Sequence, residues 1–193
     1  MFAMSALLDH PQKHPISAAE YLRMGEAGVF APEARLELIE GEIIEMAPIG
    51  SPHAGCVNKL NRLFVQRAGE AAVVGVQNPV IISNLSVPQP DLAVLKPRAD
   101  DYASSHPGTA DVYLVVEVAD TTLAFDLGRK ANVYARCGIA ELWVVDVNDR
   151  AIHVLRKPRE IGYGETFCVR LGQSIACAAF AAIEVEVAEL FST

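Results

Sequence analysis

The sequence has little positive charge. Its 193 residues include 24 Asp and Glu against 16 Lys and Arg, and the formal net charge at pH 7 is -8. This balance argues against a broad basic surface of the kind that wraps nucleic acid, because such a surface needs an excess of Lys and Arg. A local basic groove, or a metal ion that supplies positive charge, is still compatible with it.

The chain also lacks the features of a secreted or membrane-spanning protein. Its four cysteines (Cys56, Cys137, Cys168 and Cys177) form no CxxC pair, and a chain of 193 residues does not need disulfides to fold. No apolar run is as long as a membrane-spanning helix, which needs about 18 residues. Residues 1–15 lack the basic and apolar regions of a signal peptide. We therefore expect a cytoplasmic protein in a reducing compartment, with no membrane partner.

What the sequence does contain is enough apolar material for one core. Hydrophobic residues make up 51% of the chain and charged residues 21%, as in ordinary globular proteins. There is no internal repeat, low-complexity tract or long linker, and the length favours one domain. We predict a loosely ordered N-terminal tail over residues 1–16 and a single domain over residues 17–193.

Local patterns predict several helices and strands. Ser17 and Glu20 form a capping-box pattern, which predicts a helix over residues 18–25, and alternating runs around Glu40-Gly41 predict a hairpin. Apolar residues at helical spacing predict a second helix over 53–68. Runs typical of strands cover residues 71–77, 78–83, 90–95, 112–120, 141–148 and 151–158.

The last 30 or so residues look like further short strands, with a helical or extended end around 185–191. A third helix is predicted over 126–137, with Asp126 as its N-cap and Gly138 just after its end. This order of elements predicts an α/β or α+β domain in which a mixed sheet is flanked by the helices at 53–68 and 126–137.

Two acids interrupt apolar strands. Asp91 opens PDLAVL directly after Pro90, and Glu117 lies inside VYLVVEVAD. Alternation predicts two faces for the second strand, with Val112, Leu114, Val116 and Val118 on one and Tyr113, Val115 and Glu117 on the other. A strand this apolar is usually buried on both faces, so we expect Glu117 to be covered. A buried carboxylate needs a proton, a cation or a metal ion beside it.

Lys130 is the third unusual residue. It falls on the apolar stripe of the predicted third helix, together with Leu127, Ala131 and Tyr134. Lysine is rarely buried without a partner, and the short connection over 119–125 lets this helix fold back so that Lys130 reaches Asp91 and Glu117. Two carboxylates and a lysine suit a hard divalent cation such as Mg²⁺, with the lysine acting on a metal-bound water or on phosphate.

In this order the motifs resemble the PD-(D/E)XK nuclease superfamily. The matching pieces are QPD at 89–91, VVEVAD at 115–120, the helix with an inner lysine, and GIAELWVVD at 138–146. RLELIEGEIIEMAP at 35–48, followed by a histidine, is similar to the opening of the Uma-type restriction endonuclease family, formerly a domain of unknown function. The resemblance covers about residues 17–160, and the combination is more specific than any single motif.

The resemblance implies a restriction-endonuclease-like core with Asp91, Glu117 and Lys130 as catalytic residues. Asp91 and Glu117 would be the ligands of Mg²⁺ or Mn²⁺. The superfamily's usual lysine lies two residues after the second acid, where this chain has Ala119. In the Uma-type branch the lysine is thought to lie on the next helix, which is the place of Lys130. Candidates for the family's further ligand or orienting group are His53, Glu42 and Glu37.

The same resemblance implies an Mg²⁺-dependent endonuclease that acts on DNA, most simply double-stranded DNA. Cutting both strands of a duplex needs two sites, so we expect a homodimer. Phosphate contacts would come from basic side chains on the helices, for which the candidates are Lys59, Arg62, Arg67, Arg129 and Arg136.

Each of these residues also has a simpler interpretation. Asp91 could be a turn acid, Glu117 could pair with an arginine at a strand end, and Lys130 could extend past the edge of its helix. His53 could form a hydrogen bond at a helix start, and Glu37 and Glu42 could be solvated. For the whole chain, the alternative is a catalytically silent nuclease-fold binding or interaction module, which the acidic balance and the lack of an obvious DNA-reading element favour.

Overall fold

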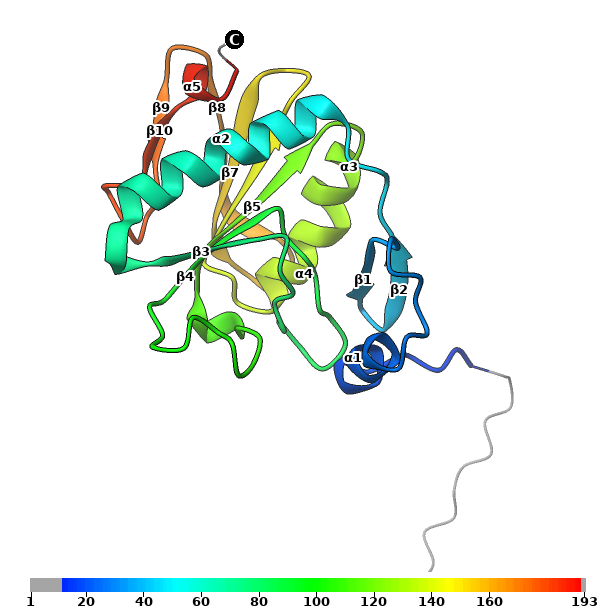
Figure 1. The fold of residues 1–193 in the computed structure, drawn as a ribbon. Coiled ribbons are helices and arrows are strands. Elements are labelled where there is room, and N and C mark those ends of the chain that lie inside the picture. The colour runs from blue at the N-terminus through cyan, green and yellow to red at the C-terminus, as the bar shows by residue number, and fades with distance from the viewer. Residues whose placement is uncertain (1–11, 192–193) are drawn as a thin grey trace, which may run out of the picture.

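The computed structural model describes residues 12–191, and its centre is a six-stranded mixed sheet (Figure 1). The strand order is β3-β4-β5-β6-β7-β8. β5 and β6 run parallel, and the other neighbouring pairs are antiparallel. The strands are β3 (Val73–Val76), β4 (Leu92–Leu95), β5 (Val112–Ala119), β6 (Glu141–Asp146), β7 (Ala151–Pro158) and β8 (Tyr163–Arg170).

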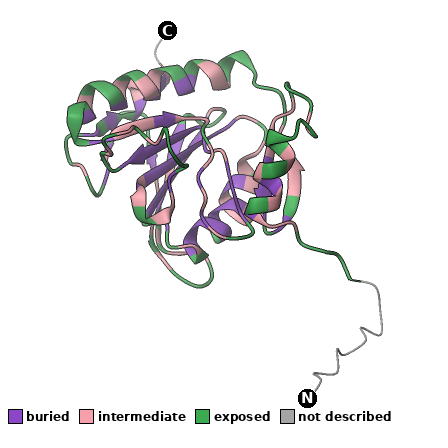
Figure 2. Ribbon diagram, turned by 60° about the horizontal axis from the view of Figure 1, so that its bottom comes forward, coloured by how far each residue is buried: buried purple, intermediate pink, exposed green. Residues whose placement is uncertain are grey.

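Helices cover both faces of this sheet, and the central strands are almost entirely buried (Figure 2). α2 (Ser51–Ala68) covers one face, where the Phe64 ring packs edge-on against Trp143. The other face is covered by one continuous helix made of α3 (Leu123–Phe125), the π-helical turn η3 (Asp126–Lys130) and α4 (Ala131–Arg136). This helix connects the parallel strands β5 and β6. The mixed sheet between helices confirms the predicted fold class.

The N-terminal elements pack beside the sheet and confirm two local predictions. α1 (Ala18–Glu26) begins with the complete capping box of Ser17 and Glu20. β1 (Leu36–Ile39) and β2 (Glu42–Glu45) form the hairpin around Glu40-Gly41. Gly41 has a positive φ, and a Cβ at this position would collide with Pro15, so the turn requires glycine.

The C-terminal part adds a small second layer next to α2. β9 (Ser174–Ala176) pairs with β10 (Glu184–Glu186), and α5 (Val187–Phe191) follows. Arg67 of α2 donates to Glu189 of α5 at 2.6 Å. Two short 3₁₀ turns, η1 (Gly69–Ala71) and η2 (Thr109–Asp111), complete the described elements.

Two predictions from the sequence are wrong, one for a strand over residues 78–83 and one for the start of the third helix. Residues 78–83 form only isolated bridges rather than a strand; Pro79 lacks an N–H for a ladder, and β3 already occupies the outer edge of β4. The third helix begins at Leu123, three residues before Asp126. Asp126 therefore lies inside the helix and is not its N-cap.

The predicted alternation along β5 holds only from Leu114 onward. The pairing of β4 with β5 has an irregularity that places Leu95 opposite Val112. As a result Val112 packs with the core on the α4 side, whereas Tyr113 packs with the core on the α2 side. The bulge reverses the first two side chains but leaves Glu117 on the face that alternation predicted for it.

Within residues 12–191, no helix has the length and apolarity needed to cross a membrane. Most of the predicted N-terminal tail, residues 1–11, lies outside the described residues.

Candidate active site

The central pairing of the sheet brings Asp91 and Glu117 together. Leu92 of β4 pairs with Val116 of β5 in antiparallel register. One further step places Asp91 opposite Glu117, with both side chains on the same face of the sheet. Both are buried, with 6% and 3% of their surface exposed. The two acids that interrupted separate apolar strands in the sequence are therefore cross-strand neighbours.

Three donors surround the carboxylate of Asp91. Its Oδ2 accepts a hydrogen bond from the Val118 backbone N–H at 2.8 Å and lies 3.0 Å from Nε2 of His53, while its Oδ1 accepts from Gln77 at 3.1 Å. Burial alone would raise the pKa of Asp91. The hydrogen bond and charge of His53, with the Val118 and Gln77 donors, outweigh burial and hold this pKa below its usual value. Asp91 is thus kept ionised in a buried place.

Lys130 comes from the helix that covers this face. Its Nζ lies 2.9 Å from Oε1 of Glu117 and 3.0 Å from Oε2 of Glu37, and only 1% of the side chain is exposed. The Tyr134 hydroxyl donates to the same Oε1 of Glu117 at 2.6 Å. Asp126, Lys130 and Tyr134 follow one another at intervals of four, so all three lie on the inner side of the helix.

The helix carries its π-helical turn at Asp126–Lys130. Such turns are rare, and they occur often at functional sites. Here the turn contains two of the buried charged residues of the pocket. Asp126 accepts a 2.5 Å hydrogen bond from the Thr122 hydroxyl, which also belongs to the start of the helix.

The site holds more buried carboxyl groups than basic groups. Four carboxylates are buried, those of Glu37, Asp91, Glu117 and Asp126, against the single ammonium of Lys130. Burial, reinforced by the other carboxylates, raises the pKa of Glu117 to about 8 in spite of Lys130. Burial likewise raises the pKa of Asp126. Burial opposes the charge on Lys130, yet the surrounding carboxylates raise its pKa, so it stays protonated.

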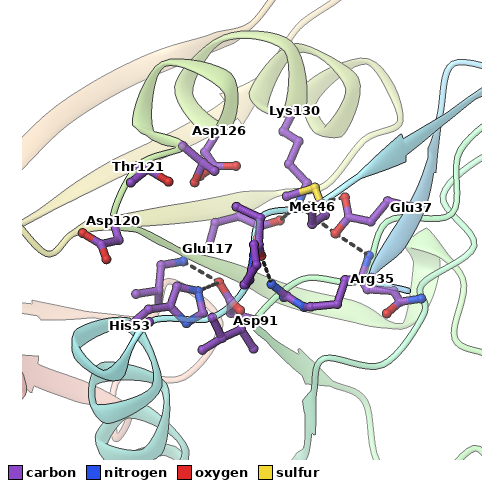
Figure 3. Close-up of a pocket in the computed structure, with 17 residues that line it drawn as sticks. Arg35, Glu37, Met46, His53, Asp91, Glu117, Asp120, Thr121, Asp126 and Lys130 are labelled. Atoms are coloured by element: carbon purple, nitrogen blue, oxygen red, sulfur yellow. Dashed lines mark hydrogen bonds and ion pairs between the residues drawn. The ribbon is translucent and has the colours of Figure 1, made fainter. Parts of the chain in front are cut away.

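These residues line a pocket of about 140 Å³ (Figure 3). Lys130 reaches from the helix toward Glu37 and Glu117, and His53 faces Asp91 from the first turn of α2 (Figure 3). Arg35 lies on the hairpin side of the pocket and donates to the Ala47 carbonyl at 2.6 Å. The remaining wall is formed by the loop after β2 and the segment after β5, with residues Met46, Pro48, Ile49, Gly50, Asp120 and Thr121.

Of the three candidates for a further ligand or orienting group, two line the pocket and one does not. Glu37 and His53 both line the pocket, next to Lys130 and Asp91 respectively. Glu42 does not line it, because its exposed carboxylate at the turn end of the hairpin pairs with Arg129 at 2.8 Å and Lys13 at 3.3 Å. The two glutamates lie on the same face of the hairpin, but Glu42 is next to the turn, opposite Ile39, whereas Glu37 is further along β1, opposite Ile44.

The basic candidates all lie outside the pocket. Arg129 pairs with Glu40 and Glu42, and Arg136 pairs with Glu40. Arg67 is bound to Glu189. On the same helix α2, Arg62 is exposed and Lys59 is partly buried.

Sequence reasoning missed Asp126 as a pocket residue because it was interpreted as a helix cap. Its spacing of four before Lys130 was the available signal, since two residues at this spacing share a helix face. Arg35 and Asp120 were also missed. They lie at element ends, and no local pattern in the sequence places either of them in a pocket.

The donor set suits a hard divalent cation. Within residues 12–191, no three His, Cys, Asp or Glu side chains are grouped as a preformed metal site. Mg²⁺ does not require such a group, because it is often held by one or two carboxylates and keeps several waters. Asp91 and Glu117 supply two adjacent carboxyl groups, and the buried carboxyl groups around them outnumber the single ammonium of Lys130, so a bound cation would stabilise their ionised forms.

The comparisons with known proteins agree with this architecture. The model of the Uma2 family, described as "Putative restriction endonuclease", matches residues 18–188. No curated protein matches the chain. The fold is similar to the crystal structure of a "putative nuclease belonging to DUF820" from Anabaena variabilis, with a TM-score of 0.70 and 18% sequence identity, covering 92% of this chain and 98% of that chain. The family match spans nearly the whole described region and includes every pocket residue, so the chain belongs to the Uma2 family of restriction-endonuclease-like proteins.

Proposed function

We propose that the protein is a divalent-metal-dependent endonuclease that hydrolyses phosphodiester bonds of double-stranded DNA. The observation that carries the proposal is the pairing of Asp91 with Glu117 across β4 and β5, with Lys130 of the next helix 2.9 Å from Glu117. Two carboxylates and a cationic side chain in one pocket are the groups that this reaction needs. Membership of a nuclease family supports the same reaction class.

Asp91 and Glu117 are the residues that would hold Mg²⁺ or Mn²⁺. When bound, such a cation polarises the phosphate and lowers the pKa of an attacking water. Asp91 is prepared for this role because its donors keep it ionised. Glu117 would lose its proton if a cation were bound there, since a nearby positive charge lowers the pKa of a carboxyl.

Lys130 acts as a fixed positive charge rather than as a base. Its carboxylate neighbours keep it protonated, and a protonated ammonium cannot accept the proton of an attacking water. It can stabilise negative charge that develops on the phosphate in the transition state. Glu37 is the second ion-pair partner of the ammonium, at 3.0 Å, so Lys130 would keep a partner if Glu117 held a cation.

A cleavage assay on several nucleic-acid forms tests this proposal. Purified protein is incubated with plasmid, linear duplex, single-stranded DNA and RNA, in Mg²⁺, in Mn²⁺ and in EDTA. We expect cleavage of duplex DNA in either metal and none in EDTA. Asp91→Ala and Glu117→Gln should each lower the rate by about 10²-fold or more. Glu70→Gln, which removes an exposed carboxylate at the other end of α2, is the matched control. Equal cleavage by wild type and both pocket variants would overturn the proposal.

One observation favours the second candidate, a catalytically silent binding module. Three of the basic side chains expected to contact phosphate are instead paired with acids of the same chain: Arg67, Arg129 and Arg136. Calorimetry with Mn²⁺ separates the two candidates. The nuclease is expected to bind Mn²⁺ and to lose that binding in Glu117→Gln, whereas a silent module binds no Mn²⁺ and cuts no nucleic acid.

We also propose that the enzyme is cytoplasmic. We further propose that it works as a homodimer, because cutting both strands of a duplex requires two sites. Light scattering at the concentration of the cleavage assay tests the oligomeric state. A monomeric mass in the presence of duplex DNA and Mg²⁺ would overturn the dimer without affecting the proposed chemistry.

A further inference from the structure

A second cavity adjoins the pocket of Asp91 and Glu117. It has a volume of about 480 Å³ and lies between the first half of α2, the turn after β6 and the end of α5. Asp120 lines both cavities, and Gly50 of the first is followed directly by Ser51 of the second. We call this second cavity the flanking groove. Anything elongated that occupies the first pocket would continue into it.

Basic residues outnumber acids in the lining of the flanking groove. Its lining contains two basic residues, Lys59 and Arg150, and one acid, Asp120, whereas the whole chain has a net charge of -8. Arg150 is exposed, and no acid within residues 12–191 forms an ion pair with it. This separates Arg150 from the arginines whose charge is already neutralised by neighbouring glutamates.

Arg150 is carried by a rigid turn. The buried carboxylate of Asp146 accepts hydrogen bonds from the N–H groups of Asn148 and Asp149, both at 3.0 Å. The Asn148 side chain donates to the Asp120 carbonyl at 2.6 Å, which joins the turn to the end of β5. The guanidinium therefore extends from a backbone that is fixed relative to the pocket.

The wall of the groove opposite Arg150 is formed by the first half of α2. Gly55 lies in the interior of this helix, and a Cβ added there would meet no atom within 4 Å. Glycine lowers helix stability relative to alanine, and here no packing within the described chain requires it. What the glycine leaves is room for the close approach of something outside the chain. Phe191, partly buried at the end of α5, adds an apolar surface to the same groove.

We infer that the flanking groove binds the sugar-phosphate backbone of the DNA strand beside the bond that is cut, an inference that rests on the proposed function. Arg150 contacts a phosphate, and Gly55 lets the strand lie against α2. Phosphate contacts from fixed basic side chains and backbone position a nucleic acid without reading its sequence. A local contact of this kind agrees with the absence of a broad basic surface.

Steady-state cleavage of two substrates tests the inference. One is a DNA duplex and the other is bis(4-nitrophenyl) phosphate, which has no sugar-phosphate strand to lie along the groove. Arg150→Glu should lower kcat/KM on DNA by about tenfold and reduce its dependence on salt by about one phosphate contact. Gly55→Gln, which fills the groove without changing charge, should also lower it. Neither variant should change the rate on the small diester.

Two matched controls accompany these variants. Arg23→Glu makes the same charge change on the exposed side of α1, away from both cavities, and should leave kcat/KM on DNA unchanged. Gly55→Ala adds only a Cβ and should lower it less than Gly55→Gln.

The outcomes separate the groove from the proposed function. If Arg150→Glu and Gly55→Gln cleave DNA as fast as wild type does, the inference about the groove is wrong and the proposed function is unaffected. An equal loss on DNA and on the small diester also overturns it, since the residues would then act on the pocket or the fold. If wild type cleaves only the small diester, the inference about the groove is wrong. If wild type cleaves neither substrate, the groove and the proposed function are both wrong.

Discussion

The ammonium of Lys130 lies 2.9 Å from Oε1 of Glu117, and 3.0 Å from Oε2 of Glu37 on its other side. One buried cation therefore joins the long helix after β5, the central strand β5 and the N-terminal hairpin. The N-terminal elements, which share no sheet with β5, are held to the pocket by this charge. Lys130 has a structural role as well as a proposed catalytic one, and the two can be measured separately.

Lys130→Met should destabilise the protein strongly. Removing one partner of a buried ion pair leaves uncompensated charge, which typically costs about 3–5 kcal/mol. Urea denaturation at pH 8 in EDTA measures this cost. Arg129→Met, which breaks the partly exposed pairs of the preceding residue, should cost about 1 kcal/mol or less. Adding Glu37→Gln to Lys130→Met should recover part of the loss. A Lys130→Met variant as stable as wild type would mean that the carboxyls around Lys130 carry protons.

Glu117 should make stability depend on pH. Its pKa is raised to about 8 in the folded protein from an ordinary 4.5, so folding takes up a proton between these values. The unfolding free energy contributed by Glu117 is therefore greatest below about pH 4.5 and falls as pH rises through about 8. Urea denaturation at pH 5, 6.5 and 8 in EDTA should show the stability of wild type, relative to Glu117→Gln, falling with pH. A difference that rises with pH would contradict the raised pKa.

His53 should control the ionisation of Asp91. His53 provides the hydrogen bond and charge that offset the burial of Asp91, so in His53→Ala burial prevails and the pKa of Asp91 rises. Carboxyl ¹³C NMR titration of the metal-free protein measures the change directly. Gln77→Ala removes a weaker donor and should shift the pKa of Asp91 upward by less. An unchanged Asp91 titration in His53→Ala would assign the low pKa to the Val118 N–H.

Much of this fold was predictable because its signals are local. The capping box of Ser17 and Glu20 and the turn at Glu40-Gly41 each depend on residues a few positions apart, and both formed as expected. The burial of Glu117 and Lys130 also followed from period-2 and period-3.6 patterns. These patterns state which face a residue occupies once the element exists.

What sequence could not supply was the choice among tertiary neighbours. Glu37 and Glu42 both lie on the hairpin, and only the packing of β1 against the body of the protein makes one buried and the other exposed. Asp126 satisfies the residue preferences of a helix cap, yet the helix begins one turn earlier, at Leu123, whose side chain packs against the core on the α4 side. A cap preference of about 1 kcal/mol is easily exceeded by such packing.

Metal binding should stabilise the folded protein by an amount that grows with the logarithm of the metal concentration relative to its Kd. A ligand that binds only the folded state at a hundred times its Kd adds about 2.7 kcal/mol to the unfolding free energy. We expect Mn²⁺ to raise the Tm of wild type, and EDTA to reverse this shift. The shift should be larger at pH 8 than at pH 6, because Glu117 must lose its proton to become a ligand. Glu117→Gln should abolish the shift in Tm. Glu70→Gln, which removes an exposed carboxylate away from the pocket, should leave the shift in Tm unchanged. Equal shifts in both variants would show that Mn²⁺ binds elsewhere on the acidic surface, and would remove Glu117 from the metal site.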